Sequence, residues 1–273
     1  IMALLPATAF GIFNFGLSAL VVVVVTTASA VLTEYVYQKL MHKKVTIGDY
    51  SAAVTGLLLA LNLPSTLPIW MAVLGSAFAI IVVKQLYGGI GQNFMNPALG
   101  ARCFLLISFT GRMTTFVYDG VSGATPLALL KAGERVNVFD MFLGNIGGCI
   151  GEVSALAILI GFVYLLIRKV ILPTIPLIYV GVVFVLAWAT NLDPVFFILS
   201  GGLMLGAVFM ATDYATSPVT PKGQIIYGIG CGIFTVIFRY FGLFPEGVTY
   251  AILLMNACAW AIDRYMAPRR FGT

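Results

Sequence analysis

A run of small residues that ends in a hydroxyl is the first feature of this sequence with evident chemistry. It reads Asp119-Gly120-Val121-Ser122-Gly123-Ala124-Thr125-Pro126-Leu127. Pro126 biases Thr125 toward an extended backbone, and Gly123 and Ala124 leave room for a large group to approach the chain. A modifying enzyme could therefore bind this stretch as an extended strand and reach the Thr125 hydroxyl from solvent. Considered alone, the same residues also suit a plain turn.

Two carboxylates lie in or beside apolar segments. Glu152 falls inside an apolar stretch that begins near Met141. A charge is costly there unless it is paired or hydrated, so a functional role is the default hypothesis. Arg102 or a bound ion is its expected partner. Asp213 is the weaker case, because it also suits a cytoplasmic loop. Both are candidates for an ion or proton path.

Four glycines within the same apolar stretch form two interleaved GxxxG pairs, namely Gly144, Gly147, Gly148 and Gly151. A phosphate-binding loop is disfavoured, because no strand precedes them. Close packing between membrane helices accounts better for their spacing. The pattern therefore favours one helix running through this region.

The composition places these residues in a membrane protein. Of 273 residues, 60% are hydrophobic and 9% are charged, and the mean hydropathy is +1.03. A soluble domain carries roughly a quarter charged residues, so this chain could not cover a water-facing surface. The net charge of +5 does not indicate nucleic-acid binding, because the basic residues are dispersed between apolar runs. The apolar opening run has no basic flank, so we expect the tail of a segment whose beginning is missing, not a signal peptide.

Nine apolar segments have about the length that a membrane-spanning helix needs, or somewhat less. They are 14–38, 49–63, 67–86, 94–110, 141–169, 174–190, 195–211, 224–240 and 247–266, and the incomplete run at 1–10 would make ten. We therefore predict an all-α integral membrane protein with about ten spans, forming a single domain over 1–273. The longest polar connection is 111–140.

The basic residues orient these segments. If the segments alternate in direction, ten basic residues share one side: Lys39, Lys43, Lys44, Lys84, Arg168, Lys169, Lys222, Arg264, Arg269 and Arg270. The other side receives Arg112, Lys131, Arg135 and Arg239. Because basic residues gather in cytoplasmic loops, the first side is predicted to be cytoplasmic. The 111–140 connection then faces outward.

Three stretches interrupt apolar segments, at 63–68, 88–97 and 211–218. Irregular backbone at membrane depth is tolerated where protein or a cavity satisfies its polar groups, and such broken helices flank substrate sites in transporters. Ordinary loops just outside the bilayer are the alternative.

Several motifs together resemble a known family. Asp119-x-x-Ser122-Gly123-Ala124-Thr125 is similar to the signature at which a flavin transferase attaches FMN to threonine. The stretches 55–64, 88–93, 96–99 and 151–154 also resemble, in the same order, the membrane subunits RnfD and NqrB. These belong to the Rnf ferredoxin:NAD oxidoreductase and the sodium-translocating NADH:quinone reductase. The short outer loops and the 125–131 stretch favour the RnfD type.

The resemblance implies a function. Thr125 would carry FMN as a phosphoester on the outer side, with Asp119, Ser122, Gly123 and Ala124 as the attachment motif. A second, noncovalent flavin, riboflavin, would lie nearer the cytoplasm, beside Asn93 and Asn96, whose amides both donate and accept. Asn96 followed by Pro97 also suits a helix start, with Asn96 as the cap. The family fold resembles that of urea channels.

The expected function is electron transfer within an ion-translocating Rnf-type oxidoreductase of the bacterial cytoplasmic (inner) membrane, coupled to Na⁺ or H⁺ transport. Expected partners are a second flavinylated subunit on the outer side, cytoplasmic redox subunits, the flavin transferase and the lipid bilayer. A solute channel or transporter without a redox cofactor is the alternative, since fold does not fix function. A permease has no reason to carry a flavinylation motif.

Overall fold

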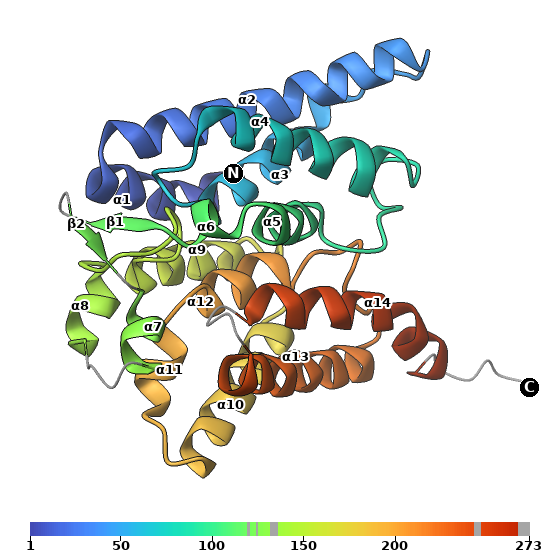
Figure 1. The fold of residues 1–273 in the computed structure, drawn as a ribbon. Coiled ribbons are helices and arrows are strands. Elements are labelled where there is room, and N and C mark those ends of the chain that lie inside the picture. Colours follow the sequence, from blue (N-terminus) through green and yellow to red (C-terminus); the bar gives the residue numbers. More distant parts are fainter. Residues whose placement is uncertain (119–120, 124, 132–135, 243–246, 267–273) are drawn as a thin grey trace, which may run out of the picture.

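A computed structural model describes residues 1–118, 121–123, 125–131, 136–242 and 247–266 (Figure 1). Helices dominate its first part. They are η1 (Met2–Leu4), α1 (Leu5–Phe15), α2 (Leu17–Leu40), η2 (Ile47–Asp49), α3 (Ser51–Leu61), α4 (Ile69–Phe78) and α5 (Pro97–Ser108). The π-helical segment η3 (Ala79–Gln85) continues α4 directly. Four of the predicted apolar segments, from 14–38 to 94–110, are therefore helical with ends within a few residues of the prediction.

The predicted outer connection holds the one departure from an all-helical fold among the described residues. After α6 (Thr110–Met113), strands β1 (Phe116–Tyr118) and β2 (Val121–Gly123) form an antiparallel hairpin, in which Phe116 lies opposite Gly123. The short helices α7 (Pro126–Lys131) and α8 (Val138–Leu143) follow. The all-α prediction is thus correct for the helical body and missed this hairpin.

The second part of the chain is again helical. Its elements are α9 (Ala155–Ile167), α10 (Thr174–Ala189), α11 (Pro194–Leu199), α12 (Leu203–Leu205), the π-helical η4 (Gly206–Met210), α13 (Pro221–Phe241) and α14 (Val248–Met266). In the core, α2 packs on α3 and α4, and α13 packs between α10 and α14. Leu61, Tyr179 and Ile252 are fully buried between these helices.

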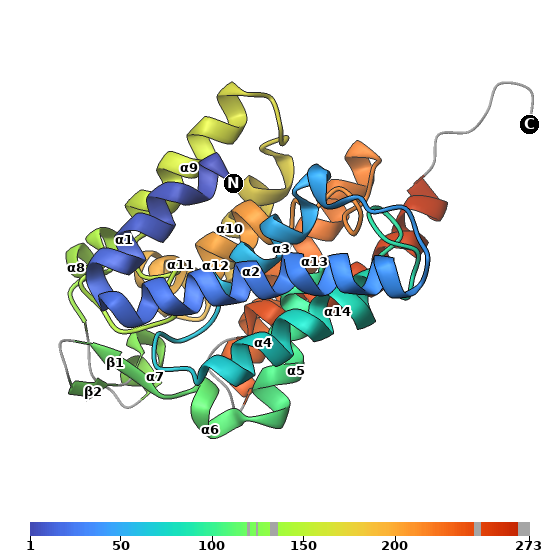
Figure 2. The same cartoon turned by 90° about the horizontal axis from the view of Figure 1, so that it is seen from above.

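The molecule has two distinct ends. Figures 1 and 2 both show the hairpin, α7 and α8 at the left, and the C-terminal ends of α2 and α14 at the right. The basic residues of the last turns of α2 and α14, Lys39 and Arg264, therefore lie away from the hairpin. This separation agrees with the division into two sides made from the charges.

Two of the described helices, α2 and α13, are long and apolar enough to cross a membrane by length and composition. Six further apolar helices are shorter, including α3, α5 and α9. The helical, apolar character of the chain is therefore confirmed, whereas the number of about ten spans stays a prediction.

The helix predicted over 141–169 is confirmed from Ala155 to Ile167 (α9), and the prediction is wrong for the residues between α8 and Ala155. The chain leaves α8 at Gly144, where φ is +113°, and stays irregular up to Ser154. Its backbone is satisfied by the broken end of α3, because Ile150 N donates to Leu63 O (3.1 Å) and Gly151 N donates to Leu61 O (2.8 Å). The glycines consequently serve an irregular chain and not a GxxxG helix pair: a Cβ on Gly151 would lie 2.5 Å from Leu61 Cβ.

A second segment, predicted as continuous over 195–211, is broken at Ser200, Gly201 and Gly202, between α11 and α12. The three interruptions predicted at 63–68, 88–97 and 211–218 are confirmed as non-helical connections, apart from Pro97, which begins α5.

Two basic residues that the charge pattern assigned to opposite sides of the membrane are buried inside helices. Lys84 lies in η3 and Arg239 in α13, each 3% exposed or less. Arg239 donates to the carbonyls of Phe197 and Ser200 at the end of α11, which places a cation where a helix leaves carbonyls without partners. The expectation that Lys84 marks a loop was wrong, because its side chain is buried.

Candidate functional site

A cavity of about 300 Å³ lies where several broken helices meet. Its walls come from α3, η3, the 86–96 connection, the start of α5, η4 and the 211–220 connection. Three of the residues singled out in the sequence, Asn93, Asn96 and Asp213, line it together. The other lining residues are Ser51, Val54, Thr55, Leu58, Lys84, Ile90, Gly91, Pro97, Ala98, Phe209 and Ala215. The fold thus brings polar groups from distant parts of the sequence into one mainly apolar space, which we call the first cavity.

Asn96 acts as the N-cap of α5. Its Oδ1 accepts hydrogen bonds from Ala98 N (3.0 Å) and Leu99 N (3.3 Å), and Pro97 occupies the first turn. Its Nδ2 donates to Met210 O (3.4 Å). The helix-cap interpretation is therefore confirmed, and both ends of this amide are already engaged within the protein.

Asn93 leaves one polar atom available. Its Nδ2 donates to Met95 O (3.1 Å), and within the described chain no donor is recorded for its Oδ1. The side chain is buried. Of the two asparagines, Asn93 is consequently the one that can offer a hydrogen-bond acceptor to a ligand in the first cavity.

Asp213 lies in the irregular 211–220 connection. Its carboxylate accepts hydrogen bonds from Ala215 N (3.4 Å) and Thr216 Oγ1 (3.1 Å). Burial raises the pKa of Asp213 above its ordinary value, and these two hydrogen bonds oppose the rise. The cavity wall therefore holds a carboxyl group that keeps its proton more readily than a solvated one.

Both π-helical segments contribute to this cavity. Lys84 comes from η3 and Phe209 from η4. Residues in π-helices make up well under 1% of soluble globular proteins, and single π-turns within helices are frequent at functional sites. The convergence of two such segments on one space marks the first cavity as the candidate site.

A buried ion pair beside the cavity went unnoticed in the sequence. Lys84 Nζ lies 2.9 Å from each carboxylate oxygen of Glu34 in α2, and it donates to Ser51 Oγ (2.6 Å). Gln38 and Gln85 also donate to Glu34 Oε1. A signal was present, since Glu34 lies inside the predicted segment 14–38, where a carboxylate is costly.

Glu152 forms a separate buried ion pair. Its Oε2 lies 3.9 Å from Nη2 of Arg102, and its Oε1 accepts a hydrogen bond from Cys149 N (3.0 Å). Arg102 Nη1 also donates to Asn62 Oδ1 (2.8 Å). The expected pairing with Arg102 is confirmed. Glu152 does not line the first cavity, so the structure does not bring it together with Asp213.

Thr125 lies directly before α7, beside the hairpin. Its carbonyl accepts from Leu129 N (2.9 Å) and its Oγ1 from Ala128 N (3.4 Å). Only 5% of Thr125 is exposed, which contradicts the expectation that solvent reaches its hydroxyl. Ser122 and Gly123 are in β2, so their extended backbone agrees with the prediction. Asp119 and Ala124 lie outside the described residues.

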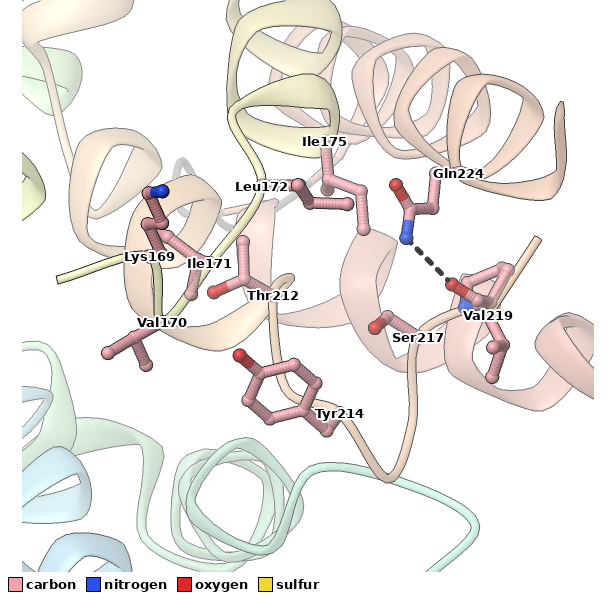
Figure 3. A pocket seen from close by; sticks show the side chains of 11 residues that line it. Lys169, Val170, Ile171, Leu172, Ile175, Thr212, Tyr214, Ser217, Val219 and Gln224 are labelled. Carbon is pink, nitrogen blue, oxygen red and sulfur yellow. Dashed lines mark hydrogen bonds between the residues drawn. The ribbon is translucent and has the colours of Figure 1, made fainter. Parts of the chain in front are cut away.

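A second cavity, of about 290 Å³, is also lined by residues of the 211–220 connection. Figure 3 shows Thr212 and Tyr214 on one side of it and Gln224, which donates to Pro218 O (3.3 Å), on the other. Thr212 and Tyr214 line the second cavity, whereas Asp213 and Ala215 line the first. Successive residues of one segment therefore face different spaces.

Comparison with known proteins identifies the kind of molecule that carries this site. Residues 1–272 match the model of the NQR2, RnfD, RnfE family. The chain belongs to this family.

Named members of the NQR2, RnfD, RnfE family resemble the chain along its whole length. It is 53% identical to the D-subunit of the Na⁺-translocating ferredoxin:NAD⁺ oxidoreductase complex of Acetobacterium woodii, covering all of this chain and 88% of the relative. It is 43% identical to the proton-translocating counterpart of Clostridium ljungdahlii, covering all of this chain and 89% of the relative. The D-subunit of an ion-translocating oxidoreductase complex of Methanosarcina acetivorans is 39% identical over the whole chain and 90% of its own length.

These findings confirm two of the sequence predictions. The resemblance to the RnfD/NqrB family was correct. The relatives are named as subunits of oxidoreductase complexes, so the chain is a subunit of an enzyme of this kind. Membership in a multi-subunit complex follows from the same names.

Proposed function

We propose that the chain is the RnfD-type subunit of an ion-translocating ferredoxin:NAD⁺ oxidoreductase complex in a cytoplasmic membrane, and that it relays electrons across that membrane. Full-length similarity to subunits named for such complexes supports the proposal. The coupling ion is Na⁺ or H⁺, because these two relatives are named for different ions. The urea-channel-like arrangement of about ten spans is part of the same proposal.

The first cavity is the proposed site of a noncovalent riboflavin. Val54, Leu58 and Phe209 give it apolar walls, while Asn93 supplies an acceptor. Ligand sites typically combine such walls with a few placed polar groups. A flavin supplies one- and two-electron transfer when it is bound, and the protein supplies its position, its electrostatic surroundings and its access to water. The residues present fit this group.

Thr125 is the proposed attachment point of FMN. Within the described part of the chain its Oγ1 has one long contact, from Ala128 N at 3.4 Å, so few described neighbours hold the hydroxyl in place. The residue is buried, however, so attachment through a phosphoester requires the hairpin and α7 to separate or to close after the transfer. The observation that carries the proposal is the Ser122–Thr125 motif at the junction of a hairpin and a helix in a member of this family.

The test is the flavin content of the denatured chain purified from its native membrane. We expect flavin fluorescence that survives denaturation, and its loss in Thr125→Val, which removes the oxygen at nearly constant volume. Thr115→Val is the matched control, because Thr115 is an exposed threonine near the same hairpin. Fluorescence that persists in Thr125→Val moves the attachment elsewhere. A chain that carries no flavin at all favours a solute channel.

A further inference from the structure

A buried cation faces the first cavity. Lys84 and Ser51 line the cavity, whereas Glu34, Gln38 and Gln85 do not. The side chains of Lys84 and Glu34 are 4% and 1% exposed, and Glu34 lies behind the ammonium with both oxygens at 2.9 Å. The ion pair therefore has its positive end toward the cavity.

Stability alone does not explain this pair. Withdrawing two charges from water is expensive, and replacing a buried pair with apolar residues of similar volume is often neutral or stabilising. The cluster does join α2, α3 and η3 through Glu34, Ser51 and Lys84. Three apolar side chains would join the same helices. The charges consequently point to a role in the adjacent site.

We propose that Lys84, oriented by Glu34, is a positioning residue whose charge favours the reduced form of the electron carrier in the first cavity. The inference rests on the proposed function, since it needs a carrier there that gains negative charge on reduction. Opposite charges several ångströms apart attract by more than the thermal energy at the intermediate dielectric of a buried site. The attraction between Lys84 and the reduced carrier exceeds the repulsion from Glu34, because Lys84 lines the cavity and is the nearer of the two to the carrier.

The orientation of the pair gives two predictions of opposite sign. Replacing both charges, in Lys84→Met with Glu34→Gln, removes the cation and leaves no unpaired carboxylate. The equilibrium constant for reduction of the carrier should then fall at least tenfold. For a one-electron couple this lowers the midpoint potential by about 59 mV or more. Glu34→Gln alone keeps the cation and removes its counter-charge, so the midpoint potential should rise.

The experiment is a reductive titration of the noncovalent flavin in the full-length chain, purified from membranes in a Thr125→Val background that removes the covalent flavin. Lys84→Arg keeps the charge, so its equilibrium constant for flavin reduction should stay within threefold of that of the parent. Thr46→Val is the control, because Thr46 accepts a hydrogen bond from Gln38 in the cluster but does not line the cavity.

An unchanged potential in the double variant, or a fall in Glu34→Gln, would overturn the inference. Loss of flavin from both Lys84→Arg and the double variant would mean that the ion pair only holds the helices together. That result would also overturn the inference. If the parent chain holds no noncovalent flavin, the proposed function is itself contradicted at this site.

Discussion

The carboxylate of Glu152, in the irregular 144–154 chain, lies 3.9 Å from the guanidinium group of Arg102 in α5. The contact joins two of the broken regions, because Arg102 also binds Asn62 at the end of α3. A third region is close by, since a Cβ on Gly202 would lie 2.6 Å from Glu152 Oε2. One ion pair therefore stands where three interruptions of the helices meet.

The two charges should be energetically coupled. Arg102→Met leaves the buried carboxylate without its counter-charge, so we expect it to cost about 3–5 kcal/mol of stability. Adding Glu152→Gln should recover part of that cost, giving a coupling energy of at least about 1 kcal/mol. Thermal unfolding of the four proteins in detergent measures the cycle. Strictly additive losses would show that the pair does not act as a unit.

The glycine beside the pair should be intolerant of a methyl group. Gly202→Ala places its Cβ against Glu152 Oε2, so overpacking should destabilise the chain by about 1–3 kcal/mol. Gly181→Ala in α10 is the control, because a Cβ there meets open space. Equal melting temperatures for the two variants would mean that Glu152 moves aside freely.

The two asparagines of the first cavity should separate into a ligand contact and a cap. Asn93→Leu removes the available acceptor, so the noncovalent flavin should be depleted while FMN stays on Thr125. Asn96→Leu should mainly lower stability, by about 1 kcal/mol, as expected for a lost N-cap. Extraction and quantification of free and covalent flavin, with unfolding curves, distinguish them. Normal riboflavin in a folded Asn93→Leu, Asn96→Leu double variant would leave the cavity without its proposed ligand contacts.

The two ends of the molecule should be labelled from opposite sides of the membrane. Thr114 and Lys44 are both exposed, one before the hairpin and one after α2. Cys258 is an exposed free cysteine, so it is first replaced by serine. In that background, Thr114→Cys should react with an impermeant thiol reagent in intact cells. Lys44→Cys should react only after the membrane is opened. The reverse pattern would invert the predicted topology and the side on which FMN is attached.

Apolar run length was a sufficient guide to most helices, because a long run has few ways to satisfy its backbone in an apolar setting. It failed over 141–169, where Ile150 and Gly151 find partners on α3 instead. That pairing involves residues far apart in the chain, so no local pattern could reveal it. The cap at Asn96 was predictable, since its partners are two and three residues away.

The charge pattern separated the two ends, but it did not predict that single cations are buried inside helices. The rule that basic residues gather in loops assumes that each is hydrated. Lys84 and Arg239 are instead satisfied by Glu34 and by the carbonyls at the end of α11. Glu34 carried the same warning as Glu152, a carboxylate inside an apolar segment. Its partner became identifiable only when the fold placed η3 against α2.

The 212–215 segment gives the two cavities a single peptide layer as their common wall, since Thr212 and Tyr214 face one space and Asp213 and Ala215 face the other. A displacement of that segment toward either space would change the volume of both. If occupants of the two spaces compete for its position, thermodynamic linkage makes the effect reciprocal, so that each weakens the binding of the other by the same factor.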